Sequence, residues 1–119
     1  MIGIRWVAVG LLVMLSGCAA TPPSEPRELT YQAPAEETFR AGVSLMVEQG
    51  YVVRHADLSL GRAEGMLARW PGYRLLLEVD EMGNASQVRV SAWRGGQPMP
   101  PIRLDPWLVA LQERLGLAP

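Results

Sequence analysis

The pattern of apolar and polar residues predicts a first helix over residues 34–49. Its apolar residues recur at intervals of three and four and share one face: Phe39, Val43, Met46 and Val47. Pro34 suits the first turn of a helix, where its missing N–H is not needed. Gly50 follows as a stop signal. Leu45 lies off this apolar stripe.

After Gly50 the spacing of apolar residues changes from 3.6 to 2, which is typical of strands. Four alternating segments are predicted as strands: residues 51–56, 62–70, 73–80 and 87–93. The clearest of them holds Leu77, which we expect to be buried. The turns between these segments are short, and short turns make consecutive strands antiparallel neighbours.

A second helix is predicted from Asp105 to about Leu115. Its apolar face is formed by Leu104, Leu108, Leu111 and Leu115. The proline- and glycine-rich residues 95–101 before it are predicted to hold no regular element. The order helix, four strands, helix predicts an α+β domain over residues 33–119. We expect a two-layer sandwich, a four-stranded antiparallel meander with the N-terminal and the C-terminal helix on one face.

The first residues of the chain follow the order of a secretory signal peptide. A short segment with one positive charge, ending at Arg5, is followed by an apolar run from Trp6 to Leu15. A transmembrane helix needs about 20 apolar residues, and this run is shorter. Residues 1–17 are therefore predicted to be cleaved.

The run ends in Leu15, Ser16, Gly17 and Cys18. This sequence resembles the lipobox of bacterial lipoproteins. The resemblance implies cleavage before Cys18 and a diacylglycerol on its thiol. In Gram-negative lipoproteins Asp after the Cys is typical of inner-membrane retention, and here Ala19 follows. The resemblance thus implies an outer-membrane anchor with the domain facing the periplasm. An inner-membrane or cell-surface location, and an uncleaved anchor with a free Cys, stay open.

Residues 18–32 are predicted to form a tether. Residues 19–28 within them contain Pro22, Pro23 and Pro26 and almost no large apolar side chain. Such a segment buries too little surface to offset its chain entropy, and its prolines favour an extended spacer.

Composition excludes several classes of function. The 119 residues carry 11 Arg, no Lys and 12 acidic residues, a net charge of −1, so no basic excess favours nucleic acid. One Cys and one His exclude a cysteine zinc cluster and a two-histidine metal site. We expect no metal and no cofactor.

Candidate catalytic groups are few. His55 and Asp57 share a strand face, and a histidine beside a carboxylate can act as a general base. Asp80 and Glu81 are adjacent acids, and paired carboxylates can exchange protons. A surface histidine and solvated turn charges explain the same residues, and the chain has no nucleophile-elbow or phosphate-loop motif. We expect a protein that is not an enzyme.

A binding surface is predicted on the outer face of the sheet. Trp93, Arg74 and Arg89 fall on the polar side of their strands, and Trp70 precedes a turn. Trp and Arg are enriched at interface hot spots. Together with the proline-rich residues 97–101, they predict a site for an envelope protein partner.

The alternative for this face is structural. Trp93 folds over the sheet edge, and the arginines pair with Glu78 and Asp80.

One further resemblance concerns the domain. A helix that ends at Gly50 and Tyr51, then a strand, Asp57 and a turn with Gly61, resembles the helix-grip-type domains of envelope lipoproteins. One of the lipoproteins of the outer-membrane β-barrel assembly machine belongs to this group. The resemblance implies a non-catalytic interaction or assembly accessory at the outer membrane. A lipoprotein that binds lipid or a small ligand between helices and sheet is the alternative.

Overall fold

The predicted strands that follow the first helix are confirmed, and they lie side by side in chain order. The computed structural model describes residues 23–117. The elements in chain order are β1 (Arg27–Tyr31), α2 (Ala35–Glu48), β2 (Val52–Asp57), β3 (Arg62–Leu67), β4 (Tyr73–Met82), β5 (Ala85–Arg94), β6 (Gln97–Pro98), the 3-10 turn η1 (Pro101–Leu104) and α3 (Asp105–Arg114). The sheet order is β1-β5-β4-β3-β2, with β6 added to β5, and every pairing is antiparallel.

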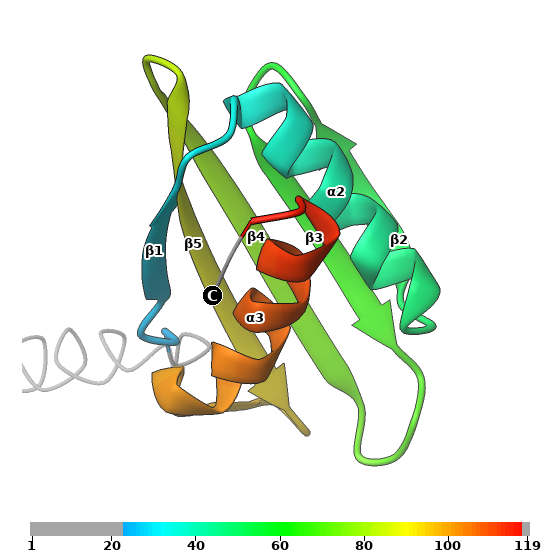
Figure 1. The fold of residues 1–119 in the computed structure, drawn as a ribbon. Helices are drawn as coiled ribbons and strands as arrows, with labels where there is room; N and C mark the ends of the chain where they lie inside the picture. The colour runs from blue at the N-terminus through cyan, green and yellow to red at the C-terminus, as the bar shows by residue number, and fades with distance from the viewer. Residues whose placement is uncertain (1–22, 118–119) are drawn as a thin grey trace, which may run out of the picture.

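Both helices cover one face of the sheet (Figure 1). We call this the inner face and the opposite one the outer face. The α+β class, the antiparallel sheet and the two helices are confirmed. The predicted signal peptide, the lipobox and the first part of the predicted tether lie outside the described residues.

The sheet has six strands and not four, and the first missed strand lies within residues 18–32. β1 pairs with β5 from Arg27 opposite Val90 to Tyr31 opposite Ser86. The Tyr31 side chain is buried on the inner face, and its hydroxyl donates to the Leu108 carbonyl oxygen of α3 at 2.7 Å. The predicted tether is therefore wrong from residue 27 onward, because this stretch is an edge strand of the domain.

The second missed strand is β6, in the segment predicted to hold no regular element. Gln97 pairs with Arg94 and Pro98 with Trp93. β4 occupies one edge of β5 along its whole length, so β6 continues the edge that β1 uses. A proline fits there because an edge strand leaves one set of N–H positions unpaired.

The buried stripe of α2 is rotated from the predicted one. Phe39 and Met46 are buried as expected, but Val47 is exposed and Val43 is only partly buried. Leu45, which fell off the predicted stripe, is buried instead. The stripe includes residues that a hydrophobicity pattern does not count, Thr38 and Gly42.

Gly42 explains this rotation. A Cβ on Gly42 would lie 2.5 Å from Leu77 Cδ2, so α2 approaches β4 through its glycine. Thr38 is buried beside it, and the Ser86 hydroxyl donates to the Thr38 hydroxyl at 2.9 Å. A small residue and a satisfied polar pair thus bring the helix close to the sheet.

One core lies between the helices and the sheet. Leu77 of β4 and Leu111 of α3 are 0 % exposed, as predicted. The expected face of α3 is confirmed, since Leu104 and Leu108 are also buried, and Trp107 packs beside them. Within residues 23–117, no helix combines the length and the apolar character that spanning a bilayer requires.

Candidate functional site

Trp93 and Arg74 lie on the outer face, as predicted, and they contact each other. They are paired across β4 and β5, and the Arg74 guanidinium carbon lies 3.9 Å from the centroid of the Trp93 ring. Only 8 % of Trp93 is accessible, so its ring is not available for the binding surface that was predicted to include it. Arg74 stacks on its ring, and the β5–β6 turn brings Pro98 back opposite it.

Arg89, the third predicted outer-face residue, takes part in ion pairs. Its guanidinium lies 2.9 Å from the Asp80 carboxylate and 3.4 Å from that of Glu78. Glu78 is its direct partner across β4 and β5. The structural alternative raised from the sequence therefore describes Arg89 better than a free hot-spot residue does.

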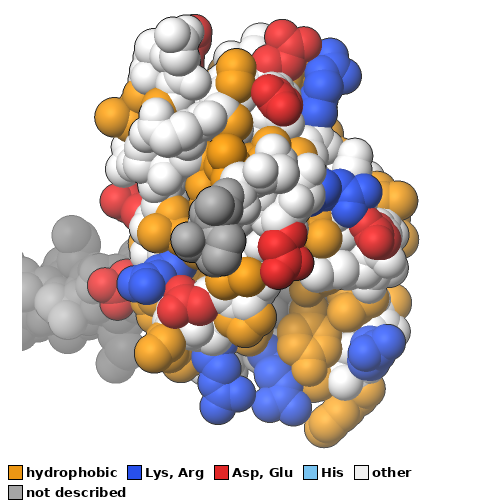
Figure 2. Space-filling model, viewed as in Figure 1, with side chains coloured by type: hydrophobic (Ala, Val, Ile, Leu, Met, Phe, Trp, Pro, Cys, Tyr) orange, Lys and Arg blue, Asp and Glu red, His pale blue; other side chains and the backbone are white. Residues whose placement is uncertain are grey.

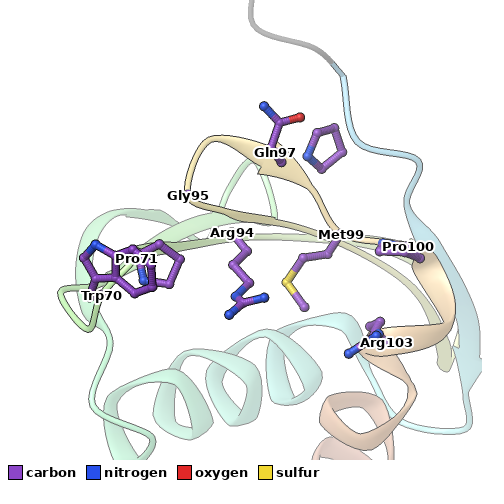
Figure 3. A pocket seen from close by; sticks show the side chains of 9 residues that line it. Trp70, Pro71, Arg94, Gly95, Gln97, Met99, Pro100 and Arg103 are labelled. Atoms are coloured by element: carbon purple, nitrogen blue, oxygen red, sulfur yellow. The ribbon is translucent and has the colours of Figure 1, made fainter.

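Trp70, the fourth predicted residue, is 88 % exposed in the connection between β3 and β4. It borders an open cleft of about 500 Å³ at the end of the sheet (Figure 3). We call this the end cleft, and its main lining residues are Trp70, Pro71, Arg94, Met99, Pro100 and Arg103. The proline-rich residues 97–101 contribute to it, so that part of the predicted site is brought together with Trp70.

Two loops are joined to form the end cleft. The Gly95 N–H donates to the Gly72 carbonyl oxygen at 2.8 Å and so links the β5–β6 turn to the β3–β4 connection. Both glycines have a positive φ, +57° and +94°, which glycine adopts without strain. In Figure 3, Arg94 and Met99 extend toward the helix side of the sheet, and Gln97 points away.

The end cleft is cationic and apolar. Arg94 and Arg103 are exposed, and neither they nor the neighbouring Arg69 form an ion pair with another residue of the described range 23–117. In Figure 2, blue arginine and orange apolar side chains line the lower edge, and the red acidic side chains lie above it together with further blue ones. The arrangement suits an anion that also carries apolar surface.

The cleft belongs to the near end of the molecule. We define the near end as the β3–β4 connection (68–72), the β5–β6 turn, η1 and the start of β1, where the N-terminal segment enters. The far end consists of the β2–β3 turn (58–61), the β4–β5 turn and the start of α2 (Figure 1).

The far end has a cleft of similar size that is lined by acidic rather than basic side chains. It measures about 460 Å³. Its lining includes Glu36, Asp80 and Glu81 beside the apolar Phe39 and Leu60.

The candidate catalytic groups do not form a catalytic pair. His55 is exposed on β2. The Asp57 carboxylate accepts hydrogen bonds from the Ser59 hydroxyl at 2.5 Å, the Ser59 N–H at 2.9 Å and the Leu60 N–H at 3.2 Å. These bonds, above all that from the Ser59 hydroxyl, hold the Asp57 pKa below its usual value. Asp57 therefore closes the β2–β3 turn.

The adjacent acids Asp80 and Glu81 do not form a catalytic pair either. Asp80 pairs with Arg89, and Glu81 is exposed. Among residues 23–117, no three His, Cys, Asp or Glu side chains are grouped so that they could hold a metal ion.

Comparison with known proteins does not assign the chain to a family. No model of a known protein family matches the chain, and no curated protein does.

Sequence reasoning missed Arg94 and Arg103, the charged residues of the end cleft. The available signal was the density of turn residues from Gly95 to Pro101 beside a second turn at Trp70 and Pro71. The two turns meet because Tyr73 faces Arg94 in the register of β4 with β5, and local sequence patterns do not give this register.

Proposed function

We propose that the chain is a non-catalytic lipoprotein of the bacterial envelope that acts by contact, as an interaction or assembly accessory. A diacylglycerol on Cys18 would hold it at the outer membrane with the domain facing the periplasm. The end cleft would be its contact site. The observation that carries the proposal is Trp70, which is 88 % exposed beside arginines that have no ion-pair partner among residues 23–117.

An exposed Trp costs free energy in water, because burying a large apolar side chain contributes roughly 1.5–3 kcal/mol. Trp70 does not support the domain core, so a binding role explains its place better than a folding role does. Trp and Arg together are the residues most enriched at interface hot spots. The support for a lipid anchor is the sequence from Leu15 to Cys18 after the apolar run.

A small-ligand function is the second candidate, and the size of the end cleft favours it. Its volume of about 500 Å³ falls within the range of ligand sites, about 300–1,000 Å³. The cleft lies at the end of the sheet rather than between helices and sheet, where the sequence alternative placed a cavity. The ligand would be an anion with an apolar part.

Two experiments test the proposal. Cys18→Ser should abolish lipid labelling and release the protein from the membrane fraction. Retention of Cys18→Ser at the mature size would contradict the lipoprotein assignment.

Contact is tested with a photo-crosslinking amino acid placed in living cells at position 70 or, as a control, at position 60. Leu60 is also strongly exposed, but it lies at the far end. We expect discrete adducts from position 70 that disappear when Arg94 and Arg103 are both changed to Gln. Adducts no more frequent at position 70 than at position 60 would overturn the end cleft as the contact site.

A further inference from the structure

The N-terminal segment enters the domain beside the end cleft. The Ser24 hydroxyl donates to the Ala92 carbonyl oxygen at 3.2 Å, and the Met99 N–H donates to the same oxygen at 2.9 Å. Ala92 thus joins the N-terminal segment to a residue that lines the cleft. Ala92 is also two residues from Arg94 on the same strand.

The position of Ser24 limits how far the domain can move from its anchor. Ser24 follows Cys18 by six positions, with five residues between them. Fully extended, six residues span about 20 Å. If Cys18 carries lipid, the near end therefore lies within about 20 Å of the acylated residue.

The near end also carries exposed apolar side chains that can enter a membrane interface. Trp70 is 88 % exposed, and Ile102 is 72 % exposed in η1 beside Arg103. Trp is the side chain that best suits the headgroup region, because its ring is apolar and its N–H remains hydrogen-bonded.

We propose that the end cleft docks on the anionic surface of the bilayer that holds the anchor, an inference that rests on the lipidation of Cys18 under the proposed function. Trp70 and Ile102 enter the interface, and Arg94 and Arg103 contact lipid phosphates. Guanidinium groups pair with phosphate through two parallel hydrogen bonds. The occupant of the end cleft is then the anionic lipid surface. The inference keeps the lipid anchor of the proposed function, and a protein partner in the same cleft is the competing outcome of the test.

The charge distribution favours this orientation over the reverse one. The near end presents Arg69, Arg94 and Arg103, which have no ion-pair partner among residues 23–117. At the far end Glu81 is exposed, Asp80 is paired with Arg89, and Arg62 starts β3. An anionic surface therefore attracts the near end more strongly than the far end. The anchor makes docking intramolecular, so weak contacts are sufficient to orient the domain.

The test uses the processed, lipidated full chain in vesicles of phosphatidylcholine with phosphatidylglycerol, and in phosphatidylcholine alone. The chain has one Cys, and in the lipidated protein the diacylglyceryl group converts its thiol to a thioether. Ile102→Cys or Leu60→Cys then provides the single free thiol for an environment-sensitive fluorophore. The two positions are matched, since Leu60 is 69 % exposed and lies at the far end.

We expect the fluorophore at position 102 to report a lipid environment in the anionic vesicles, and the fluorophore at position 60 to report water. Arg94→Gln with Arg103→Gln should lower the ratio of docked to undocked domain about 25-fold, about fivefold for each arginine. High salt should act in the same direction. Arg62→Gln, an exposed arginine at the start of β3, is the control and should leave the ratio unchanged.

Four outcomes would overturn the inference. One is a fluorophore at position 102 that reports water in the anionic vesicles. Another is a fluorophore at position 102 that reports the same lipid signal in vesicles of phosphatidylcholine alone. Shielding of position 102 that requires added envelope protein would show a protein partner; the inference would fall while the proposed function stands. Fluorophore on the wild-type chain would show that Cys18 is free, and the lipid anchor would then fall with the inference.

Discussion

The two ends of the sheet are built from the same kinds of element and carry opposite chemistry. The near end combines the exposed Trp70 with arginines that pair with no residue of the described part of the chain. The far end combines Leu60 with the carboxylates of Asp80 and Glu81. Each has an open cleft of roughly 500 Å³. Because loops at the ends of strands are free of core constraints, one core supports two ends that differ in side-chain chemistry.

The two ends share one core, so we expect them to unfold as one cooperative unit, and substitutions in the core have the largest expected effect. Leu77→Ala and Leu111→Ala should each lower the free energy of unfolding by about 2–5 kcal/mol, since both side chains are fully buried. Urea denaturation measures the loss, and amide exchange should show both ends losing protection together. An end that keeps its protection would break the comparison. Leu60→Ala is the exposed control, with an expected change within about 0.5 kcal/mol.

Substitution of Trp93 on the outer face and of Trp70 at the near end should affect stability differently. Trp93→Ala should cost about 3 kcal/mol, because the ring is buried under Arg74. Trp70→Ala should stay within about 0.5 kcal/mol of the wild type. Thermal or urea unfolding measures both. A stable Trp93→Ala variant would restore the outer face as an available surface.

The third prediction uses two glycines of the far end that have the same backbone conformation. Gly61 and Gly83 both have a φ of +63°. A Cβ on Gly61 would clash with the Val79 carbonyl oxygen, whereas nothing lies near a Cβ on Gly83. Gly83→Ala should cost about 1 kcal/mol through φ alone, and Gly61→Ala about 2–3 kcal/mol. Equal losses would show that the β2–β3 turn does not approach β4 so closely.

The fourth prediction concerns pH and the strand that connects the two ends. Burial raises the Tyr31 pKa to about 12, above its ordinary value of 10.0. The neutral phenol is favoured in the folded state, so its contribution is complete below pH 10 and is lost as the pH rises toward 12. The loss should be about 2 kcal/mol at pH 12 relative to pH 9.

Tyr31→Phe is the matched variant for this measurement. It should cost about 1 kcal/mol at neutral pH through the lost hydrogen bond to Leu108. Its stability should then fall less than that of the wild type between pH 9 and pH 12. Parallel pH profiles for the two proteins would contradict the assignment.

The smallest expected effect is at Asp57. Its pKa is lowered mainly by the Ser59 hydroxyl, so Ser59→Ala should raise it toward the ordinary value. In the wild type the lowered Asp57 pKa stabilises the folded turn at pH values above the unfolded-state pKa of Asp57. This contribution to stability is lost as the pH falls through the folded-state pKa. NMR titration of the carboxyl group measures the change. An unchanged Asp57 pKa in Ser59→Ala would show that the hydroxyl does not hold the carboxylate.

Local sequence signals were sufficient to predict the elements that pack against elements next to them in the chain. The helix at 35–48 and the four strands from β2 to β5 follow from spacing and short turns. β1 was missed because its partner lies more than 50 residues away in sequence, and only Leu29 and Tyr31 mark its inner face. An edge strand with one half-buried face gives a weak pattern beside a proline-rich segment.

The sequence predicted the residue types of the candidate site, Trp and Arg, but not where on the molecule they are accessible. Alternation assigned Trp93 and Arg74 to the outer face correctly, but alternation does not reveal that a later turn covers that face. β6 and the stacked guanidinium bury Trp93, and both depend on contacts between β4, β5 and β6. Trp70 was identified because a Trp beside a Pro-Gly turn has little opportunity for burial.

β1 has a mechanical consequence. The strand runs from Arg27 at the near end to Tyr31, and its hydrogen bonds to β5 lie across the strand direction. Tension on the N-terminal segment, directed away from the near end, pulls β1 along its own axis. The inter-strand bonds are then loaded together in shear instead of being peeled apart one after another. The strand through which an anchored chain would transmit force is thereby placed in the geometry that resists force best.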